Sequence, residues 1–448
     1  MKKTVNHILA AGLLALLSLA SCTDEFIEGN DLQGVDRDKR VEVRLPFGVG
    51  RGITTTITTR AAGGEIDYDS QLSGVMAFVY EAKSDNPEEN ELLAYHLFSN
   101  PSNKPLEGAT GGWIADNDDP TCGEIKFYVP VGDVYIYLLG NAQSSFLNFF
   151  PGVSGGDALG TQAEFFEKAT PKWNGNIHSV DGYLPLTGMV NNNTGLCHVN
   201  EQGQISYTDE EGKTHTLLPD GKHDEDNSFV LKRLMSKITM NIREGKGVKF
   251  TPRDYTVRHI PHYVSPTAQA WTEEERDRIL VEDAKPVNFF GVLDSLTFTI
   301  YLPENIRKVR PGVEITEYRQ RDKVVKTADN KNTEETAPDD FHADNADNHK
   351  GHYKFEFAPK ASTYIELTGW FENADTTVAA DVRYYIHLGN FGKDLNHFSV
   401  ERDHHYTYNV TINGVEDIVV EVEDENEKTP GAEGVVFKHE AFAHIDAH

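Results

Sequence analysis

Residues 41–60 read VEVRLPFGVGRGITTTITTR and predict a strand followed by an exposed linker. The apolar residues of the first half recur at every second position: Val41, Val43, Leu45, Phe47 and Val49. This period of two is typical of a strand that buries one face. Pro46 lacks a backbone N–H donor, so we expect the strand at the edge of a sheet. The threonine-rich residues up to Arg60 show no regular alternation, so an edge strand here could be cut free.

The rest of the chain consists of short apolar runs separated by Gly, Pro, Asn and Asp. Such runs predict an all-β fold, and 448 residues are enough for two domains with full cores. We expect two tandem antiparallel β-sandwich domains of Greek-key or transthyretin-like type, with a few short helices. The expected ranges are 61–227 and 228–424, preceded by a signal peptide over 1–21 and a leader over 22–60, and followed by a tail over 425–448.

Within the first of these domains, residues 123–129 and 132–139 predict two strands joined at residues 130–131. Thr161 and Glu164 form a capping-box pattern that predicts a short helix over 161–170, and a similar pattern predicts a helix over 271–280. Two polar stretches, 191–227 and 317–352, predict long surface excursions.

The N-terminus carries an export signal. Lys2 and Lys3 precede an apolar run over 8–19 that is too short to cross a bilayer as a helix. The run ends in Leu-Ala-Ser-Cys22, which resembles the lipobox of bacterial lipoproteins, in which the cysteine is acylated and becomes the mature N-terminus. An ordinary secretory signal cleaved near Ala20 is the alternative. Residues 24–25, Asp-Glu, resemble the acidic signal for the outer face of the outer membrane.

The net charge and the cysteine content of the chain argue against several classes of binding partner. The formal net charge is −29, which argues against nucleic acid and against electrostatic binding to anionic lipid. Beyond Cys22, only Cys122 and Cys197 remain, and no pattern of cysteines and histidines has metal-ligand spacing. The two cysteines either pair in an oxidising compartment or stay as separate buried thiols.

The far end of the chain repeats the one-faced pattern of residues 41–49. Its apolar residues share one phase of a strand: Val435, Phe437, Ala441, Ala443 and Ile445. The segment lies beyond an acidic linker, so it is a candidate strand for donation to a neighbouring molecule. A frayed tail, or a strand that closes its own domain, explains the same pattern.

Several short motifs resemble landmarks of the fimbrillin superfamily of Bacteroidia-type pili, the FimA-like lipoproteins. Their order and spacing cover nearly the whole chain after the signal peptide. They are the lipobox at Cys22, Thr-Arg-Ala at 59–61, VPVGDVY at 129–135, GNA at 140–142, LPLTG at 184–188, LMSKI at 234–238, YLPEN at 301–305 and FSVERDHHYTYNVT at 398–411.

This resemblance implies a fimbrial subunit that is exported as an outer-membrane lipoprotein and matured at the cell surface. A trypsin-like, Arg-specific protease would cut between Arg60 and Ala61, with Arg51 as an alternative site. The removed strand would be residues 41–49, and residues 435–445 would donate to another fimbrial subunit. Stalk, tip and anchor roles stay open, as does a host or bacterial surface ligand for a tip subunit.

The main rival is a surface glycan-binding lipoprotein of the SusE/SusF-like kind, which stacks sugars on exposed aromatic rings. Its candidate rings are Trp113, Trp173, Trp271 and Trp370. With four tryptophans in the chain, core positions are the commoner explanation for each ring.

An enzyme is the third class, and the sequence shows no nucleophile elbow, HExxH motif or P-loop. The histidines at 342, 349, 352, 404 and 405 fit no metal-ligand spacing, and residues 116–119, DNDD, lack the glycine and terminal glutamate of a calcium loop. We therefore expect no catalytic residues, no metal and no cofactor.

Overall fold

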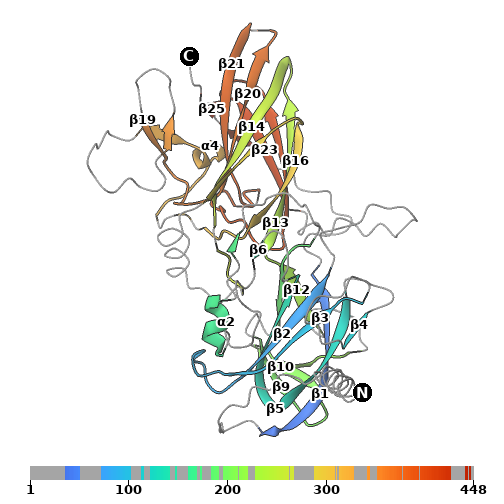
Figure 1. Cartoon of the computed structure of the whole chain (residues 1–448). Helices are drawn as coiled ribbons and strands as arrows, with labels where there is room; N and C mark the ends of the chain where they lie inside the picture. The colour runs from blue at the N-terminus through green and yellow to red at the C-terminus, as the bar shows by residue number, and fades with distance from the viewer. Residues whose placement is uncertain are drawn as a thin grey trace, which may run out of the picture.

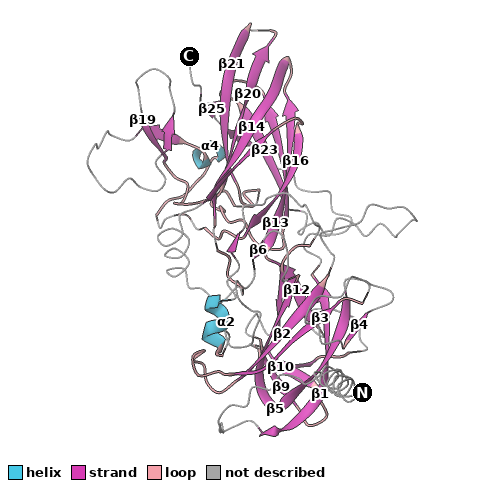
Figure 2. Ribbon diagram, in the orientation of Figure 1, coloured by secondary structure: helices cyan, strands magenta, loops and turns pink. Residues whose placement is uncertain are grey.

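A computed structural model of the chain describes residues 36–50, 72–101, 112–115, 122–141, 147–148, 160–168, 172–173, 183–190, 195–209, 211–219, 228–261, 263–266, 287–307, 309, 312–326, 341–343, 351–375, 377–392, 394–424, 439–441 and 443–444. The molecule is elongated, with N-terminal strands at one end and C-terminal strands at the other (Figure 1). Strands dominate, and the helices of the described residues are α2 (Gln162–Lys168) and α4 (Tyr318–Arg321) (Figure 2). The all-β prediction is confirmed. No helix among these residues is long and apolar enough to span a membrane.

The N-terminal end is built on one sheet, which we call the first sheet. Its strands are β1 (Asp36–Val49), β2 (Gly74–Glu81), β3 (Leu92–Ser99), β4 (Trp113–Ala115), β5 (Cys122–Gly140), β8 (Leu186–Met189), β9 (Leu196–Val199), β10 (Ile205–Thr208), β11 (Thr214–Thr216) and β12 (Phe229–Arg233). The two predicted strands over 123–139 are one continuous strand, β5, which changes partners near Gly132. Its first half pairs with β1 and β4, and its second half with β2, β8 and β9.

Four strands of the first sheet form a closed circuit of pairings. The order runs β1-β12-β8-β5, and β1 also pairs with β5. Because the circuit closes, apolar side chains from these strands point into one shared core. The β1–β12 pairing is parallel, which differs from the purely antiparallel sheets that we expected.

The C-terminal end contains two five-stranded sheets, which we call the C-terminal sheets. One has the order β16-β13-β22-β23-β24 and the other β15-β14-β20-β21-β25. Their bounds are β13 (Met235–Glu244), β14 (Val248–Ile260), β15 (Val287–Val292), β16 (Thr297–Pro303), β20 (Tyr364–Asn373), β21 (Val378–His387), β22 (His405–Ile412), β23 (Ile418–Asp424), β24 (His439–Ala441) and β25 (Ala443–His444). The pairing of β13 with β22 is also parallel.

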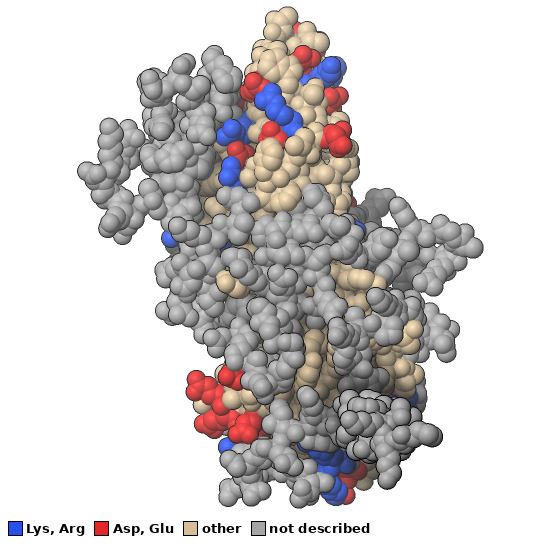
Figure 3. All heavy atoms as spheres, viewed as in Figure 1, with Lys and Arg blue, Asp and Glu red and all other residues tan. Residues whose placement is uncertain are grey.

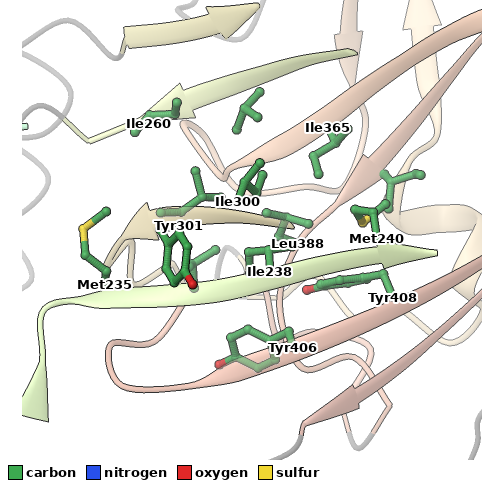
Figure 4. Close-up of a cluster of buried hydrophobic side chains, with 14 of the residues drawn as sticks. Met235, Ile238, Met240, Ile260, Ile300, Tyr301, Ile365, Leu388, Tyr406 and Tyr408 are labelled. Carbon is green, nitrogen blue, oxygen red and sulfur yellow. The ribbon is translucent and has the colours of Figure 1, made fainter. Parts of the chain in front are cut away.

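Both C-terminal sheets contribute to one hydrophobic core. Ile238 and Tyr408 come from the first of these sheets and Ile365 from the second, and Figure 4 shows them converging. The Tyr255 ring of β14 stacks on Phe298 of β16 with centroids 4.5 Å apart, which places the two sheets in direct contact. Smaller pairings complete the described strands: β6 (Leu147–Asn148) with β7 (Lys172–Trp173), and β19 (Gly351–Phe355) with β17 (Val324–Lys326) and β18 (Phe341–Ala343).

The chain passes from the first sheet to the C-terminal sheets at Leu234. β12 pairs with β8 and β1, whereas β13, which starts at Met235, pairs with β16 and β22. The domain boundary expected before residue 228 stays a prediction, and the change of strand partners lies one strand further along the chain. The apolar run over 228–244 looks continuous in the sequence because both strands bury alternate residues.

One of the two predicted helices is present, and the two predicted polar excursions contain regular secondary structure. The helix over 161–170 is confirmed as α2, with reciprocal capping bonds between Thr161 and Glu164 of 3.2 Å each. The expected polar excursion over 191–227 instead contains β9, β10 and β11, and the one over 317–352 contains α4, β17 and β18. These strands have three or four residues each, which is too short for a period of two to stand out in the sequence. The helix expected over 271–280 lies outside the described residues.

Candidate strand-replacement site

β1 contains the strand predicted from residues 41–49, and the predicted apolar residues face the core. Pro46 and Gly48 of the other phase are buried as well. Val43, Leu45 and Phe47 are each 0% exposed, whereas Val41 and Val49 are partly buried and pack against the same core. Glu42 on the opposite face is exposed. The removable strand that the sequence predicted is therefore a full contributor to the core of the first sheet.

The environment of Phe47 shows how closely the strand fits. Its ring meets Trp113 of β4 edge to face, with centroids 4.9 Å apart. At the adjacent β5 position, a Cβ added to Gly123 would lie 3.1 Å from the Phe47 ring and 2.9 Å from the backbone oxygen of Ile114. Phe47 thus fills a space that is closed by backbone and an aromatic ring, and a smaller side chain there would leave a cavity.

Along most of its length, β1 has one strand partner among the described residues. It pairs with β5 from Asp36 to Gly48, and with β12 only from Phe47 to Val49. Pro46 lies at the end of the stretch that pairs with β5 alone, which agrees with the predicted edge position.

The free edge of β1 is covered by the turn between β9 and β10. A Cβ added to Gly203, which has a φ of 76°, would lie 2.2 Å from the backbone oxygen of Glu42. Only glycine permits this close approach of the turn to β1. A 2.6 Å ion pair between Lys39 and Glu201, both exposed, joins the same two segments. The turn therefore shields backbone groups of β1 that would otherwise form an open edge.

A charged pair lies on the outward face of β1. Nε and Nη2 of Arg44 lie 2.9 and 2.6 Å from Oε2 of Glu124 on β5. Glu124 is 7% exposed, so its carboxylate depends on this guanidinium for most of its compensation. Any strand in the place of β1 has to meet the same carboxylate.

The C-terminal end of β1 reaches the passage between the sheets. The Gly50 N–H donates to the backbone oxygen of Leu231 at 2.8 Å, and its carbonyl accepts from Nη1 of Arg233 at 2.9 Å. Arg233 is fully buried, and the same Nη1 lies 2.8 Å from Oδ1 of Asp403, just before β22. A Cβ at residue 50 would lie 3.0 Å from Oδ2 of Asp403. The end of β1 thus touches groups of both the first sheet and the C-terminal part.

The candidate donor segment lies on its own C-terminal sheets where it is described. Ala441 belongs to β24, which pairs with β23, and Ala443 belongs to β25, which pairs with β21. Val435, Phe437 and Ile445 lie outside the described residues. Each of the two short strands extends one edge of a C-terminal sheet.

The predicted processing residues, Cys22, Arg51, Arg60 and Ala61, also lie outside the described residues. Cys122 and Cys197 are separate buried thiols that form no disulfide with each other, which is the second of the two alternatives considered. Burial raises the pKa of the Cys197 thiol, so this sulfur stays protonated and unreactive.

The tryptophans considered for glycan stacking fall into different environments. Trp113 packs on Phe47 in the core of the first sheet, and Trp271 lies outside the described residues. Trp173 is part of the short strand β7. Trp370 of β20 is 38% exposed, and its indole N–H donates to Glu372 at 3.0 Å.

The face around Trp370 is dominated by charged pairs. Arg253 pairs with Asp381 at 2.5 Å, and Glu366 pairs with both Arg258 and Arg383 at 2.9 and 3.1 Å. Figure 3 shows acidic and basic side chains interleaved over this end of the molecule. Trp370 is therefore an exposed ring on a mixed-charge sheet face that also exposes Phe290 and Val292 of β15.

Of the candidate histidines, His404 and His405 have defined partners. Nδ1 of His404 lies 2.9 Å from Oδ2 of Asp424, and Nε2 of His405 lies 3.0 Å from the Thr239 hydroxyl. His342 of β18 and His352 of β19 are partners in the backbone register of the two strands. Among the residues that the structure describes, no group of three or more His, Cys, Asp or Glu is arranged to hold a metal.

Sequence reasoning missed Glu124, Arg233 and Asp403, which complete the site. One signal was available for Arg233, which shares the buried phase of Phe229 and Leu231 in β12. A charged residue in the buried phase of a strand predicts a paired charge. Nothing comparable marks Asp403, because its role depends on a contact across 170 residues of sequence.

Comparison with known proteins gives one family match and several similar structures. Residues 300–410 match the family model described as a domain of unknown function, DUF4906. No curated protein sequence matches the chain.

The tip fimbrial protein Mfa3 of Porphyromonas gingivalis is similar at 13% identity and a TM-score of 0.40, over 86% of this chain and 99% of that one. A candidate cell adhesion protein of Parabacteroides distasonis is similar at 10% identity and a TM-score of 0.43, over 90% of this chain and 98% of that one. One from Bacteroides eggerthii is similar at 12% identity and a TM-score of 0.36, over 92% and 98%. The first of these solved structures is described as a fimbrial protein, and the other two as cell adhesion proteins.

Proposed function

We propose that the chain is a structural and adhesive subunit of a cell-surface fimbria that is exported as a lipoprotein and assembled by strand exchange. The observation that carries this proposal is the position of β1. It is the first described strand of the chain, and it fills the core with three fully buried side chains. Among the residues that the structure describes, it has a second strand partner only at Phe47–Val49. A single cut after it would leave it attached through non-covalent contacts alone.

The free energy of burying apolar side chains favours the replacement of β1 by another strand over a first sheet that simply lacks β1. Each fully buried Val, Leu or Phe side chain contributes about 1.5–3 kcal/mol through burial of apolar surface. A first sheet without β1 would expose these sites together with the β5 edge. A replacement strand regains both the apolar burial and the backbone hydrogen bonds, which is the physical basis of strand addition between subunits. Such assembly needs no catalytic residue.

Processing would supply the cut. Lipidation at Cys22 would place the chain at the outer membrane, and cleavage after Arg60 by an Arg-specific protease would separate residues 22–60, including β1, from the rest. The high negative charge suits a solvated extracellular surface.

The C-terminal segment supplies the candidate donor strand. Among the described residues, β24 and β25 comprise three and two residues, so few of these residues' backbone pairs are lost when the segment leaves its own sheets. Donation to another fimbrial subunit would replace these short pairings with a longer one.

The decisive experiment is N-terminal sequencing and mass determination of the protein from the cell surface, beside an Arg60→Ala variant. An Arg51→Ala variant is the matched control, because it removes the other arginine of the linker. We expect the wild type and Arg51→Ala to begin at Ala61, and Arg60→Ala to keep lipidated Cys22 and to stay out of fibres. A wild-type surface form that keeps Cys22, in cells that assemble fibres from it, would refute processing as the trigger.

A surface glycan-binding lipoprotein is the second candidate, and one observation favours it. Trp370 exposes 38% of its surface on an outer sheet face, where a sugar ring could stack on it. A glycan array probed with the wild type and Trp370→Ala tests this function, with Val378→Ala as a control because Val378 is exposed on the neighbouring strand. Glycan binding that Trp370→Ala abolishes and Val378→Ala preserves would support this candidate.

A further inference from the structure

The place of β1 in the first sheet makes strict demands on any strand that occupies it. Positions 43, 45 and 47 are three consecutive inward positions, and all are 0% exposed. They hold Val, Leu and Phe and contact a core that includes Val75, Ile125 and Phe127. Because protein cores are close-packed, an alanine or a polar side chain at any of these positions leaves a cavity or an unsatisfied polar group.

The chain's own C-terminal segment does not meet this demand. From residue 433 onward, the residues of one phase are Glu433, Val435, Phe437, His439, Ala441, Ala443 and Ile445. No three consecutive members of this series are all apolar and at least as large as valine. The other phase, Val436, Lys438, Glu440, Phe442 and His444, contains still more polar residues. This holds for every register and for both strand directions.

Two further features define the strand that would fit. Glu124 is 7% exposed and is compensated by the cation that follows position 43, so the strand should carry a basic residue on its outward face there. At position 50, a Cβ would lie 3.0 Å from Oδ2 of Asp403 and 3.3 Å from Cγ1 of Val230, so glycine fits best at that point.

We infer that the place of β1 accepts a strand from a different subunit and excludes this chain's own C-terminal segment, so that the subunit joins a heterologous partner instead of forming a homopolymer. The inference rests on the proposed strand replacement and names the partner. That partner carries an extended segment with three alternating apolar residues of valine size or larger and a basic residue between the first two.

Two substitutions distinguish the size pattern of the inward residues from the overall hydrophobicity of the segment. His439→Leu completes the run Val435, Phe437 and residue 439, so the altered segment has three large apolar residues in one phase. Ala441→Leu adds apolar bulk in the same phase and on the same short strand, β24, but every run remains interrupted by His439 or Ala443. It is therefore the matched control.

The test uses the mature chain in which residues 55–60 are replaced by the recognition sequence of a site-specific protease. After cleavage, a labelled peptide of residues 36–50 is exchanged into the protein in urea just below the unfolding transition.

Competing peptides of residues 431–448 are then added as the wild type, His439→Leu and Ala441→Leu. We expect the His439→Leu peptide to compete at least about tenfold better than the other two. It should remain weaker than the 36–50 peptide, because Val436 and Phe442 would stand where the site favours a basic residue and glycine. In size-exclusion chromatography, the cleaved wild-type chain should stay monomeric and the cleaved His439→Leu chain should form polymers.

Each outcome bears on a different step. Wild-type 431–448 peptide that competes as well as the 36–50 peptide would overturn the inference and leave strand replacement intact. Equal competition by Ala441→Leu and His439→Leu would overturn the size pattern as the criterion. A cleaved chain that does not take up the labelled 36–50 peptide at all would refute strand replacement itself, and the inference with it.

Discussion

Arg233 and Asp403 form a buried ion pair that joins the first sheet to the C-terminal part of the chain. Nη1 of Arg233 lies 2.8 Å from Oδ1 of Asp403, and the Arg233 side chain is 0% exposed. Oδ1 also accepts the backbone N–H of Arg233 at 3.2 Å. The carbonyl of Gly50 accepts from the same Nη1, so the end of β1 is part of this junction.

Asp403→Asn tests how much the buried charge depends on its carboxylate. Asparagine keeps the shape of the side chain and tolerates the φ of 61° at this position, so the change is electrostatic. We expect the free energy of unfolding to fall by about 3–5 kcal/mol, because Arg233 loses its counter-charge inside the protein. Urea unfolding followed by circular dichroism measures the difference.

The control for this prediction is Asp381→Asn, which breaks the pair with Arg253. Those side chains are 31% and 58% exposed, so solvent already screens the pair and a loss below about 1 kcal/mol is expected. Similar losses in the two variants would mean that burial does not govern the strength of the Arg233–Asp403 pair.

Phe47→Ala tests the contribution of β1 to the core. Phe47 is 0% exposed and packs on Trp113, so removal of its ring leaves a cavity that close-packed neighbours cannot fill. We expect a loss of about 3–5 kcal/mol in the free energy of unfolding, together with a change in tryptophan emission that Trp113→Phe abolishes. Glu42→Ala on the exposed face of the same strand should stay within about 0.5 kcal/mol of the wild type. Equal stability of the two variants would show that β1 is not part of the core.

Much of this site could be predicted from the sequence, because alternation along one strand is a local property. Residues 41–49 formed the predicted strand, and Val43, Leu45 and Phe47 at its centre are fully buried. The parallel contact of β1 with β12 could not be predicted, since it joins residues far apart in the chain. β14 was also missed, because its exposed face carries Arg253, Asp254 and Arg258, and the bulge between Pro252 and Asp254 interrupts the period of two.

The turn that covers the edge of β1 could not be predicted from the sequence either. Gly203 looks like an ordinary turn glycine in the sequence, but its turn covers the edge of β1. The polarity of the surrounding residues predicted a surface excursion, because strands that expose one face at the rim of a sheet have few apolar residues to reveal them.

Gly203→Ala tests whether that turn holds β1 in place, and Gly212→Ala is a closely matched control. The two glycines have φ angles of 76° and 80°, so alanine costs about 1–2 kcal/mol of backbone strain at either position. At Gly203 the new Cβ would also lie 2.2 Å from the backbone oxygen of Glu42, whereas nothing lies within 4 Å at Gly212. We therefore expect Gly203→Ala to be the less stable variant by at least about 1 kcal/mol. Hydrogen exchange should be faster in β1 for this variant alone, and unchanged exchange in β1 would contradict a role for the turn.

His404 lies in a charged cluster at the start of β22, so the stability of the fold should depend on pH. His404 bonds Asp424 at 2.9 Å and lies 3.7 Å from Glu401, and its ring stacks on Tyr406. Burial alone would lower the pKa of His404, but the hydrogen bond to Asp424 and the charges of Asp424, Glu401 and Asp403 raise it above the usual value. A hydrogen bond from His397 lowers the pKa of Glu401.

The raised pKa of His404 stabilises the fold at low pH, whereas the lowered pKa of Glu401 stabilises it at higher pH. A raised histidine pKa stabilises the fold fully below about pH 6.5, and this contribution is lost as the pH rises through the pKa of the folded state. A lowered glutamate pKa stabilises the fold above about pH 4.3, and its contribution is lost as the pH falls through the lowered value. Both contributions are therefore complete between about pH 4.3 and about pH 6.5.

His404→Gln removes the first contribution and keeps a polar side chain of similar size. Urea midpoints measured from about pH 4 to about pH 9 should show the wild type losing stability relative to this variant as the pH rises above about 6.5. His198→Gln is the control, since His198 pairs with Asp133 on the surface and both side chains are more than half exposed. A wild type and a His404→Gln variant with parallel pH profiles would mean that the cluster stabilises the C-terminal sheets by packing alone, because packing does not change when His404 loses its proton.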